Sequence, residues 1–180
     1  MIIGICGKAW AGKGAVARAL VLKHGFTELA FADPIYEAIS VITGYPVAAL
    51  KNRDLKETPL PIGASPRKLL QTLGTEWGRN TIRDDIWVAV GLQRAELAGG
   101  NVCFSDVRFE NEAQAIIEAG GAVWRVERQE CDTRMEREAL AHSSEAGVPD
   151  RLVEKIIKNN GTIGDLDSAV ARLLGDIMVA

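Results

Sequence analysis

At 180 residues, the chain is long enough to bury one sizeable hydrophobic core and short for two, so we expect a single domain. Hydrophobic residues make up 47% and charged residues 25% of the sequence, which excludes an intrinsically disordered protein. The net charge of -3 gives no overall attraction to nucleic acid or an anionic membrane, and no apolar run could span a bilayer, so we expect a cytoplasmic protein with small-molecule partners.

The first predicted element is a strand over residues 2–6, an apolar run without alternation. It leads into GKAWAGKG at residues 7–14, whose glycine and lysine spacing matches the phosphate-binding pattern G-x-x-x-x-G-K. Glycines let backbone N–H groups turn around phosphate oxygens, and the helical pattern that follows adds a helix dipole. A plain glycine-rich turn is the alternative. The residues expected to bind phosphates are Gly7, Ala11, Gly12, Lys13, Gly14 and Ala15.

Gly14 stands where such loops usually carry a hydroxyl residue that ligates magnesium. Mg2+ keeps several waters and often needs only one or two carboxylates besides the substrate phosphates. A carboxylate from another strand end, Asp106 or Asp33, could therefore hold the ion directly or through water.

A second predicted strand over residues 26–30 ends shortly before Asp33, at the edge where open α/β sheets bind ligands. Asp33 is expected to contact a ligand, or alternatively to cap a helix that begins at Pro34. Residues 34–99 then show only helical and loop patterns. This stretch interrupts the alternation of strands and helices, so it is the candidate insertion.

Within the insertion, Ser65-Pro66 predicts the start of a helix, with serine as cap and proline in the first turn. Arg67 and Gln71 lie four residues apart and therefore share one face of this helix, either toward a ligand or toward solvent. A second helical pattern covers residues 84–97. The predicted buried stripe of the first helix is Leu69, Leu70, Leu73 and Trp77.

A third predicted strand, over residues 102–105, is followed by Asp106 and then Arg108. Both side chains should point into the crevice at the carboxyl edge of the sheet; an internal ion pair between them is the alternative. Glu112 could cap or orient the next helix. A fourth strand is predicted over residues 123–126.

The segment 127–149 is polar and holds several arginines, a pattern that predicts a lid or, alternatively, a salt-bridged surface helix. Residues 153–157 form the last predicted strand, before the turn Asn160-Gly161 and a final amphipathic helix. The repeated order of strand and helix predicts a three-layer α/β fold, in which helices cover both faces of a five-stranded parallel sheet.

Several stretches together resemble the bacteriophage deoxynucleoside monophosphate kinases. They are GKAWAGKG, FADPIYEAI, SPRKLLQTLGTEWGR, DDIWV, SDVRFENEA, HSSE and NNGTIGDL. The resemblance implies a P-loop kinase fold with an acceptor-binding insertion at 34–99 and a lid at 127–149. It implies phosphorylation of deoxynucleoside monophosphates by ATP with Mg2+. The chain departs from the family at GKGA, where members commonly carry a hydroxyl residue after the lysine.

Phosphoryl transfer requires positioning and charge neutralisation more than acid–base chemistry. The expected catalytic residues are Lys13, Asp106, Arg108, Arg128 and Arg134, with Asp106 as the metal ligand. Asn160 and Gly161 are expected at the adenine. The residues expected at the acceptor nucleotide are Asp33, Arg67, Gln71, Trp87, Arg108 and Glu112.

Two alternatives remain open at this stage: another small P-loop kinase, such as a dephospho-coenzyme A kinase, and a nucleotide-binding protein without catalytic activity. The sequence assigns no role to His142, Ser144 and Glu145. It does not determine the accepted bases or the oligomeric state, for which a homodimer stays open.

Overall fold

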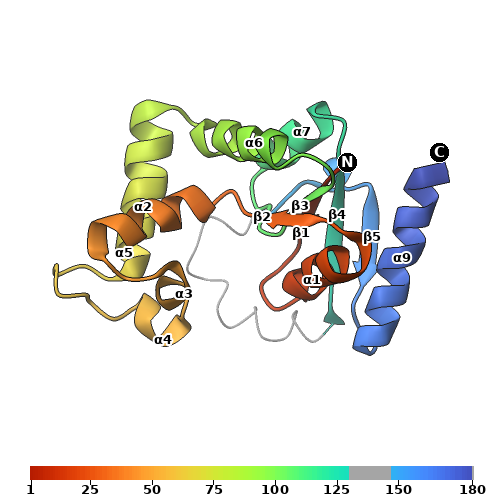
Figure 1. Cartoon of the computed structure of the whole chain (residues 1–180), viewed down its shortest axis with the longest axis horizontal. Helices are drawn as coiled ribbons and strands as arrows, with labels where there is room; N and C mark the ends of the chain where they lie inside the picture. The colour runs from red at the N-terminus through yellow and green to blue at the C-terminus, as the bar shows by residue number, and fades with distance from the viewer. Residues whose placement is uncertain (130–146, 180) are drawn as a thin grey trace. The chain divides into compact units, whose positions relative to one another are not determined.

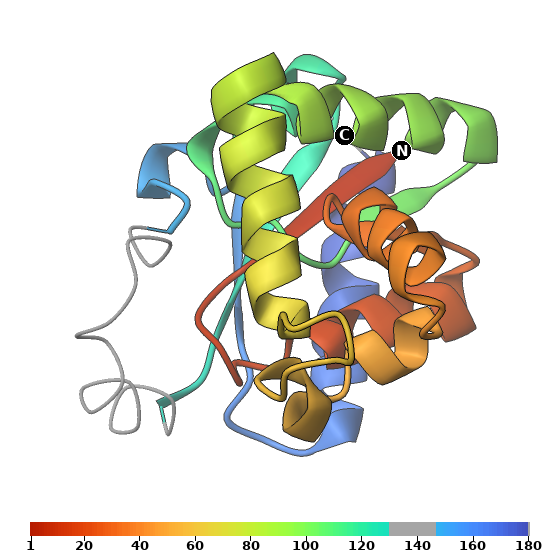
Figure 2. The same cartoon turned by 90° about the vertical axis from the view of Figure 1, so that its left-hand side faces the viewer.

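The computed structural model describes residues 1–129 and 147–179. The chain divides into two compact units, one formed by residues 1–30 and 92–180 and the other by residues 31–91. The second unit runs from orange to green in Figures 1 and 2. None of the helices in the described ranges is both long and apolar enough to cross a membrane.

The first unit contains a five-stranded sheet in which every neighbouring pair of strands is parallel (Figure 1). The strand order is β2-β3-β1-β4-β5, which confirms the predicted fold class. The last strand begins two residues later than predicted, because a 3-10 turn, η3 (Asp150–Leu152), precedes it. The strands are β1 (Ile2–Cys6), β2 (Thr27–Leu29), β3 (Val102–Phe104), β4 (Ala122–Glu127) and β5 (Lys155–Lys158).

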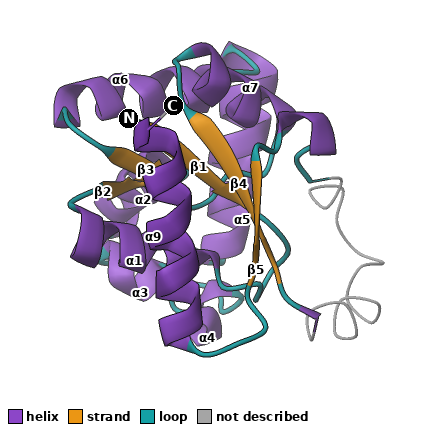
Figure 3. Cartoon of the chain, turned by 90° about the vertical axis from the view of Figure 1, so that its right-hand side faces the viewer, coloured by secondary structure: helices purple, strands orange, loops and turns teal. Residues whose placement is uncertain are grey.

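Helices cover both faces of this sheet. Ile3 and Ile5 of β1 are fully buried in the same cluster as side chains of α1 (Lys13–His24) and α9 (Ile163–Val179), which lie on one side of the sheet in Figure 3. Gly4 faces the opposite side, where α7 (Glu110–Glu118) packs so closely that a Cβ would lie 2.6 Å from Ile116 Cδ1. Strand β1 is therefore buried on both faces, as its continuous apolar sequence predicts.

The unit of residues 31–91 contains helices and loops but no strand. As predicted, a helix begins at Ser65-Pro66, where the Ser65 side chain accepts a hydrogen bond from the Lys68 N–H. The hydrophobic core of the unit of residues 31–91 consists of Ile35, Ile39, Leu50, Leu60 and Trp87. The helices are α2 (Asp33–Thr43), α3 (Val47–Leu50), α4 (Arg53–Lys56), α5 (Pro66–Gln71), the π-helix η1 (Thr72–Ile82) and the start of α6 (Ile86–Ala98).

The π-helix η1 corrects the buried stripe predicted for this region. Trp77 is 46% exposed, whereas Trp87 of α6 is only 7% exposed and donates from Nε1 to the Gly74 carbonyl at 2.7 Å. A π-helix has i→i+5 hydrogen bonds and hence more residues per turn than an α-helix, so the spacing of seven residues that returns a side chain to the same face of an α-helix no longer does so. Trp87, rather than the predicted Trp77, is therefore the buried tryptophan in the core of this unit.

We expect Gly78→Ala to lower the free energy of unfolding by about 1 kcal/mol. A Cβ there would lie 2.7 Å from the Trp87 ring, which its hydrogen bond to Gly74 holds in place. Such overpacking costs about 1–3 kcal/mol, partly offset by about 1 kcal/mol of helix propensity. Urea denaturation measures the difference, with Asn80→Ala at an exposed position of the same helix as the control. A stability equal to that of the control variant would contradict this packing argument.

Candidate active site

Residues 7–14, hereafter the phosphate loop, connect β1 to α1. Gly7 has a φ of 135°, and a Cβ there would lie 2.3 Å from the Val126 carbonyl oxygen of β4. Gly12 has a φ of 104°, and its Cβ would lie 2.2 Å from Asn159 Nδ2. Both positions therefore require glycine, because of their left-handed conformation and because of the close approach of a neighbour.

The phosphate loop ends in a helix N-terminus suited to an anion. Helix α1 begins at Lys13, its first turn holds no acidic residue, and no side chain caps it. The first amide groups of a helix lack intrahelical acceptors and lie at the positive end of its dipole. Lys13 Nζ donates to the carbonyl oxygens of Gly7 at 2.8 Å and Lys8 at 2.9 Å, so its ammonium lies over the loop. This donor set fits the phosphate chain of a nucleotide.

Asp106 lies at the carboxyl edge of the sheet, directly after β3. The N–H of Ser105 donates to the Leu29 carbonyl and that of Val107 to the Ile5 carbonyl, so the segment 105–107 lies beside the ends of β2 and β1. Asp106 is therefore near the strand that leads into the phosphate loop. No group of three His, Cys, Asp or Glu side chains in the described ranges could hold a metal on its own. A single carboxylate fits Mg2+ only together with phosphate oxygens and water.

Glu112 fixes the backbone that carries Arg108. Its side chain is buried, and Oε2 accepts hydrogen bonds from the N–H groups of Arg108 at 2.8 Å and Phe109 at 3.1 Å. This is the helix-orienting role that the sequence left as an alternative. The Arg108 side chain is exposed at the same edge of the sheet as Asp106.

Arg125, on β4, is tied to the sheet. Its guanidinium pairs with Asp150 and donates to the Val148 carbonyl, so this arginine, two residues before the predicted lid at 127–149, has structural partners. Burial raises the pKa of the neighbouring Cys6 thiol, and the charge of Arg125 offsets only part of that effect. Cys6 is consequently a neutral, buried side chain at pH 7.

The turn after β5 lies against the phosphate loop. Asn159, a residue that the sequence analysis did not select, donates from Nδ2 to the Ala11 carbonyl at 2.8 Å. The Asn160 side-chain oxygen accepts a hydrogen bond from the Gln129 N–H at 3.0 Å. Gly161 follows, and Thr162 and Asp165 then cap α9 reciprocally; the hydrogen bonds from Thr162 lower the pKa of the Asp165 carboxyl. The sequence signal that could have identified Asn159 is its position shortly after a predicted strand, at the edge of the sheet where the phosphate loop lies.

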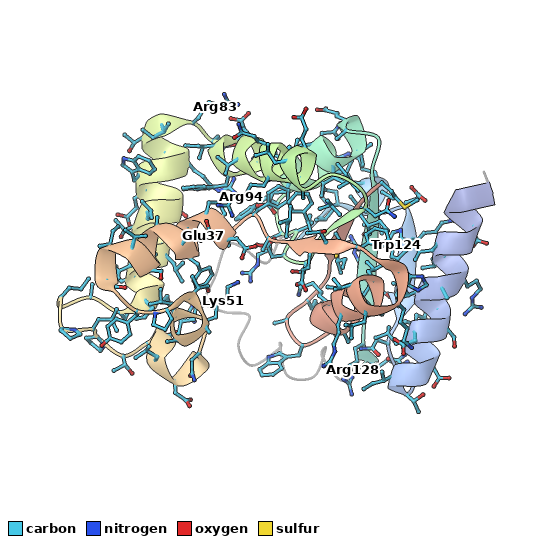
Figure 4. The ribbon with its side chains drawn as sticks, viewed as in Figure 1. Glu37, Lys51, Arg83, Arg94, Trp124 and Arg128 are labelled. Carbon is cyan, nitrogen blue, oxygen red and sulfur yellow. The ribbon has the colours of Figure 1, made fainter. Side chains whose placement is uncertain are left out.

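In the unit of residues 31–91, Ala32 rather than Asp33 is the N-cap of α2. Asp33 is the first helical residue and Pro34 the second, so the capping alternative for Asp33 is wrong by one position. The Asp33 carboxylate accepts a hydrogen bond from Lys51 Nζ at 2.9 Å, and the same ammonium lies 5.1 Å from the centroid of the Tyr36 ring. Lys51 is labelled in Figure 4.

Arg67 and Gln71 both lie exposed on α5. The Arg67 guanidinium pairs with Glu57, and both side chains of this pair are about half exposed. Trp87 is in the core of this unit. The predicted contacts of Arg67, Gln71 and Trp87 with a nucleotide stay predictions.

Most of the predicted lid lies outside the described residues. Of its proposed catalytic residues, Arg128 follows β4 and is exposed (Figure 4), whereas Arg134 falls within 130–146. His142, Ser144 and Glu145 lie in that range as well.

The chain is similar in sequence to proteins described as deoxynucleotide or deoxynucleoside monophosphate kinases. A family model for deoxynucleotide monophosphate kinase matches residues 62–170. A protein of Acanthamoeba polyphaga mimivirus that is named as a deoxynucleotide monophosphate kinase is 31% identical in an alignment of 148 residues, and this alignment covers 71% of this chain and 74% of that protein. The deoxynucleoside-5'-monophosphate kinase of Escherichia phage T5 is 30% identical over 106 residues, which are 57% of this chain and 41% of that enzyme.

Among solved structures, TT1252 from Thermus thermophilus aligns with a TM-score of 0.53 over 98% of this chain and 97% of its own. The sequence identity is 17%, so this likeness concerns the fold.

Proposed function

The chain belongs to the deoxynucleotide monophosphate kinase family, and on that premise we propose that it transfers the γ-phosphoryl group of ATP to a deoxynucleoside monophosphate. The observation that carries the proposal is the family match over residues 62–170. An oxygen of the acceptor phosphate attacks the γ-phosphorus, and the bond from that phosphorus to the β–γ bridging oxygen breaks. ADP leaves with the electron pair of that bond, and a deoxynucleoside diphosphate is formed.

On the donor side, we assign the phosphate chain of ATP to Lys13 and to the backbone N–H groups of Gly12 and Gly14. Gly7, Ala11 and Ala15 are assigned to the lining of the loop, since the Ala15 N–H already donates to the Gly12 carbonyl at 2.9 Å. The donor set of the phosphate loop and the N-terminus of α1 support this assignment. Asn160 and Gly161 are assigned to the adenine.

Asp106 is assigned to Mg2+, which would neutralise charge on the phosphate oxygens when bound. Arg108 and Arg128 are assigned to the charge that spreads over the transferring phosphoryl group, and Arg134 joins them by sequence alone. Electrostatic stabilisation of this kind is the main catalytic contribution in phosphoryl transfer.

Residues 34–99 are assigned to the acceptor, with Arg67, Gln71 and Trp87 as its contacts there. Outside this range, Asp33, Arg108 and Glu112 are assigned to the acceptor as well. The acceptor and donor are metabolites of the cytoplasm, where we expect the reaction to occur. A coupled assay of ADP formation with ATP and Mg2+ tests the proposal over dGMP, dTMP, dCMP, dAMP and dephospho-coenzyme A. Turnover of dephospho-coenzyme A alone would favour the alternative kinase, and no turnover of any acceptor would favour a non-catalytic protein.

We expect Arg67→Ala to raise the KM for the deoxynucleoside monophosphate at least about 10-fold, because a hydrogen bond to a charged group contributes about 1.5–3 kcal/mol. The KM for ATP should change less than about twofold. The ion pair of Arg67 with Glu57 is exposed and therefore weak, so an acceptor phosphate can compete for the guanidinium. Initial rates at varied concentrations of each substrate separate the two effects.

The control for this experiment is Lys68→Ala, which removes a neighbouring exposed charge of α5 whose partner is Glu76. Both KM values should stay near those of the parent. If Arg67→Ala raised only the KM for ATP, the assignment of α5 to the acceptor would be wrong.

A further inference from the structure

We propose that Asn159 is a positioning residue that holds the phosphate loop in its anion-binding conformation. It also connects this loop to the turn Asn160-Gly161, which is assigned to the adenine. The inference rests on the proposed function, because it concerns how the same site binds ATP. The side chain that contacts the phosphate loop comes from the end of β5, 148 positions after Ala11 in the chain.

The two hydrogen-bonding ends of Asn159 have separate tasks. Its backbone N–H donates to the Glu127 carbonyl at 2.7 Å and so continues the pairing of β5 with β4. Its side-chain Nδ2 donates to the Ala11 carbonyl at 2.8 Å. The strand needs only the backbone contact. The side chain is therefore directed to the phosphate loop.

The Ala11 carbonyl requires such a partner. Ala11 is fully buried, and a buried carbonyl without a hydrogen bond loses the full solvation of that group. Gly12 can have no side chain, because its Cβ would meet the Asn159 amide at 2.2 Å. The Asn159 side chain thus contacts the phosphate loop at both residues of one peptide bond, at the Ala11 carbonyl and at the Gly12 Cα.

The same contact fixes the direction of a donor. In a planar trans peptide, the C=O and N–H bonds point in opposite directions. With the Ala11 carbonyl bound to Asn159, the Gly12 N–H must point away from Asn159. A flip of this peptide would exchange the two groups and place a carbonyl oxygen where an anion needs an N–H. Asn159 therefore acts against the flip, in a loop that has no hydroxyl after Lys13 to add a further ligand.

Asn159 also joins two parts of the nucleotide site. Its neighbour Asn160 accepts a hydrogen bond from the Gln129 N–H, so the turn assigned to the adenine is anchored to the end of β4. The phosphate loop and this turn are linked through Asn159. Loss of the link should weaken binding of the donor nucleotide and spare the acceptor.

The test uses Asn159→Leu, which keeps the volume and removes the donor without adding charge. Calorimetric titration of the full chain with ADP, without acceptor, should show a dissociation constant about 10-fold above that of the parent, the loss expected for one hydrogen bond together with its positioning effect. The KM for ATP should rise similarly, and the KM for the acceptor should stay within about twofold. Asn101→Leu, exposed before β3 at the opposite edge of the sheet, is the control and should leave all three values unchanged.

Hydrogen exchange of the nucleotide-free protein gives a second readout. The amides of residues 11–15 should exchange faster in Asn159→Leu than in the parent, while those of β1 stay protected. If Asn159→Leu does not fold, Asn159→Ala decides by the same two measurements. ADP affinity and exchange rates equal to those of the parent would overturn the inference. A parent that binds ADP but phosphorylates no deoxynucleotide would instead refute the proposed function, and ADP binding would still decide the role of Asn159.

Discussion

Lys13→Ala is expected to lower the rate of phosphoryl transfer at least about 100-fold, the loss typical of removing one group that stabilises the transition state. The ammonium lies over the phosphate loop, bound to the carbonyl oxygens of Gly7 and Lys8. In the proposed complex, phosphate oxygens of ATP would compete for the same ammonium, and no other residue of α1's first turn is charged. The free energy of unfolding should change by less than about 1 kcal/mol, because the substitution lies at a loop that is open to solvent.

The measurement is kcat with ATP and the preferred acceptor, together with urea denaturation of the same sample. Lys23→Ala is the matched control: it removes a lysine from the last turn of the same helix, where the partner is Asp167. Its turnover should equal that of the parent. Turnover within about threefold of the parent in Lys13→Ala would remove the assignment of the loop to the donor phosphates.

Asp106→Asn is expected to lower kcat about 100-fold and to raise the Mg2+ concentration needed for half-maximal rate. The substitution keeps the shape of the side chain but removes the charge that a hard cation prefers. Gly14→Ser should change kcat by less than about threefold. A Cβ at Gly14 would meet nothing within 4 Å, so a serine fits there without strain and only adds a ligand.

A titration of rate against Mg2+ in the parent, Gly14→Ser and Asp106→Asn decides between two roles of Asp106. If it served only to pair with Arg108, its loss would weaken acceptor binding or stability, and the Mg2+ dependence would match the parent. That outcome would leave Asp33 or water to complete the metal site.

The sheet could be predicted from the sequence because each central strand is apolar on both faces. The run at residues 2–6 has no polar residue to place toward solvent, and the structure covers it with α1 and α9 on one side and α7 on the other. Strand ends were less certain. The apolar pattern places Val153 in the last strand, but Val153 is the C-cap of the turn η3, and β5 begins two residues later at Lys155.

The part of the site that lies in one short motif, the phosphate loop, could be predicted from the sequence. The contacts that join this loop to residues far away in the chain could not. The glycines of the phosphate loop are visible as a spacing. The contact of Asn159 with Ala11 depends on β5 and β1 ending at the same edge, which no local pattern encodes. The predicted burial of Trp77 was wrong for another reason. The prediction assumes the α-helical period of 3.6 residues, whereas η1 is a π-helix with more residues per turn, and Trp87 is the buried tryptophan instead.

The π-helix also determines where the later residues of this segment lie around the helix axis. A π-helix advances by fewer degrees per residue than an α-helix, so the residues from Thr72 to Ile82 would carry the chain further around the axis if they formed α-helical hydrogen bonds. Gly78 would then no longer face Trp87, and a bulkier residue would take its place against the ring. The packing of Trp87 in the core of residues 31–91 therefore depends on the π-helical hydrogen bonds of η1.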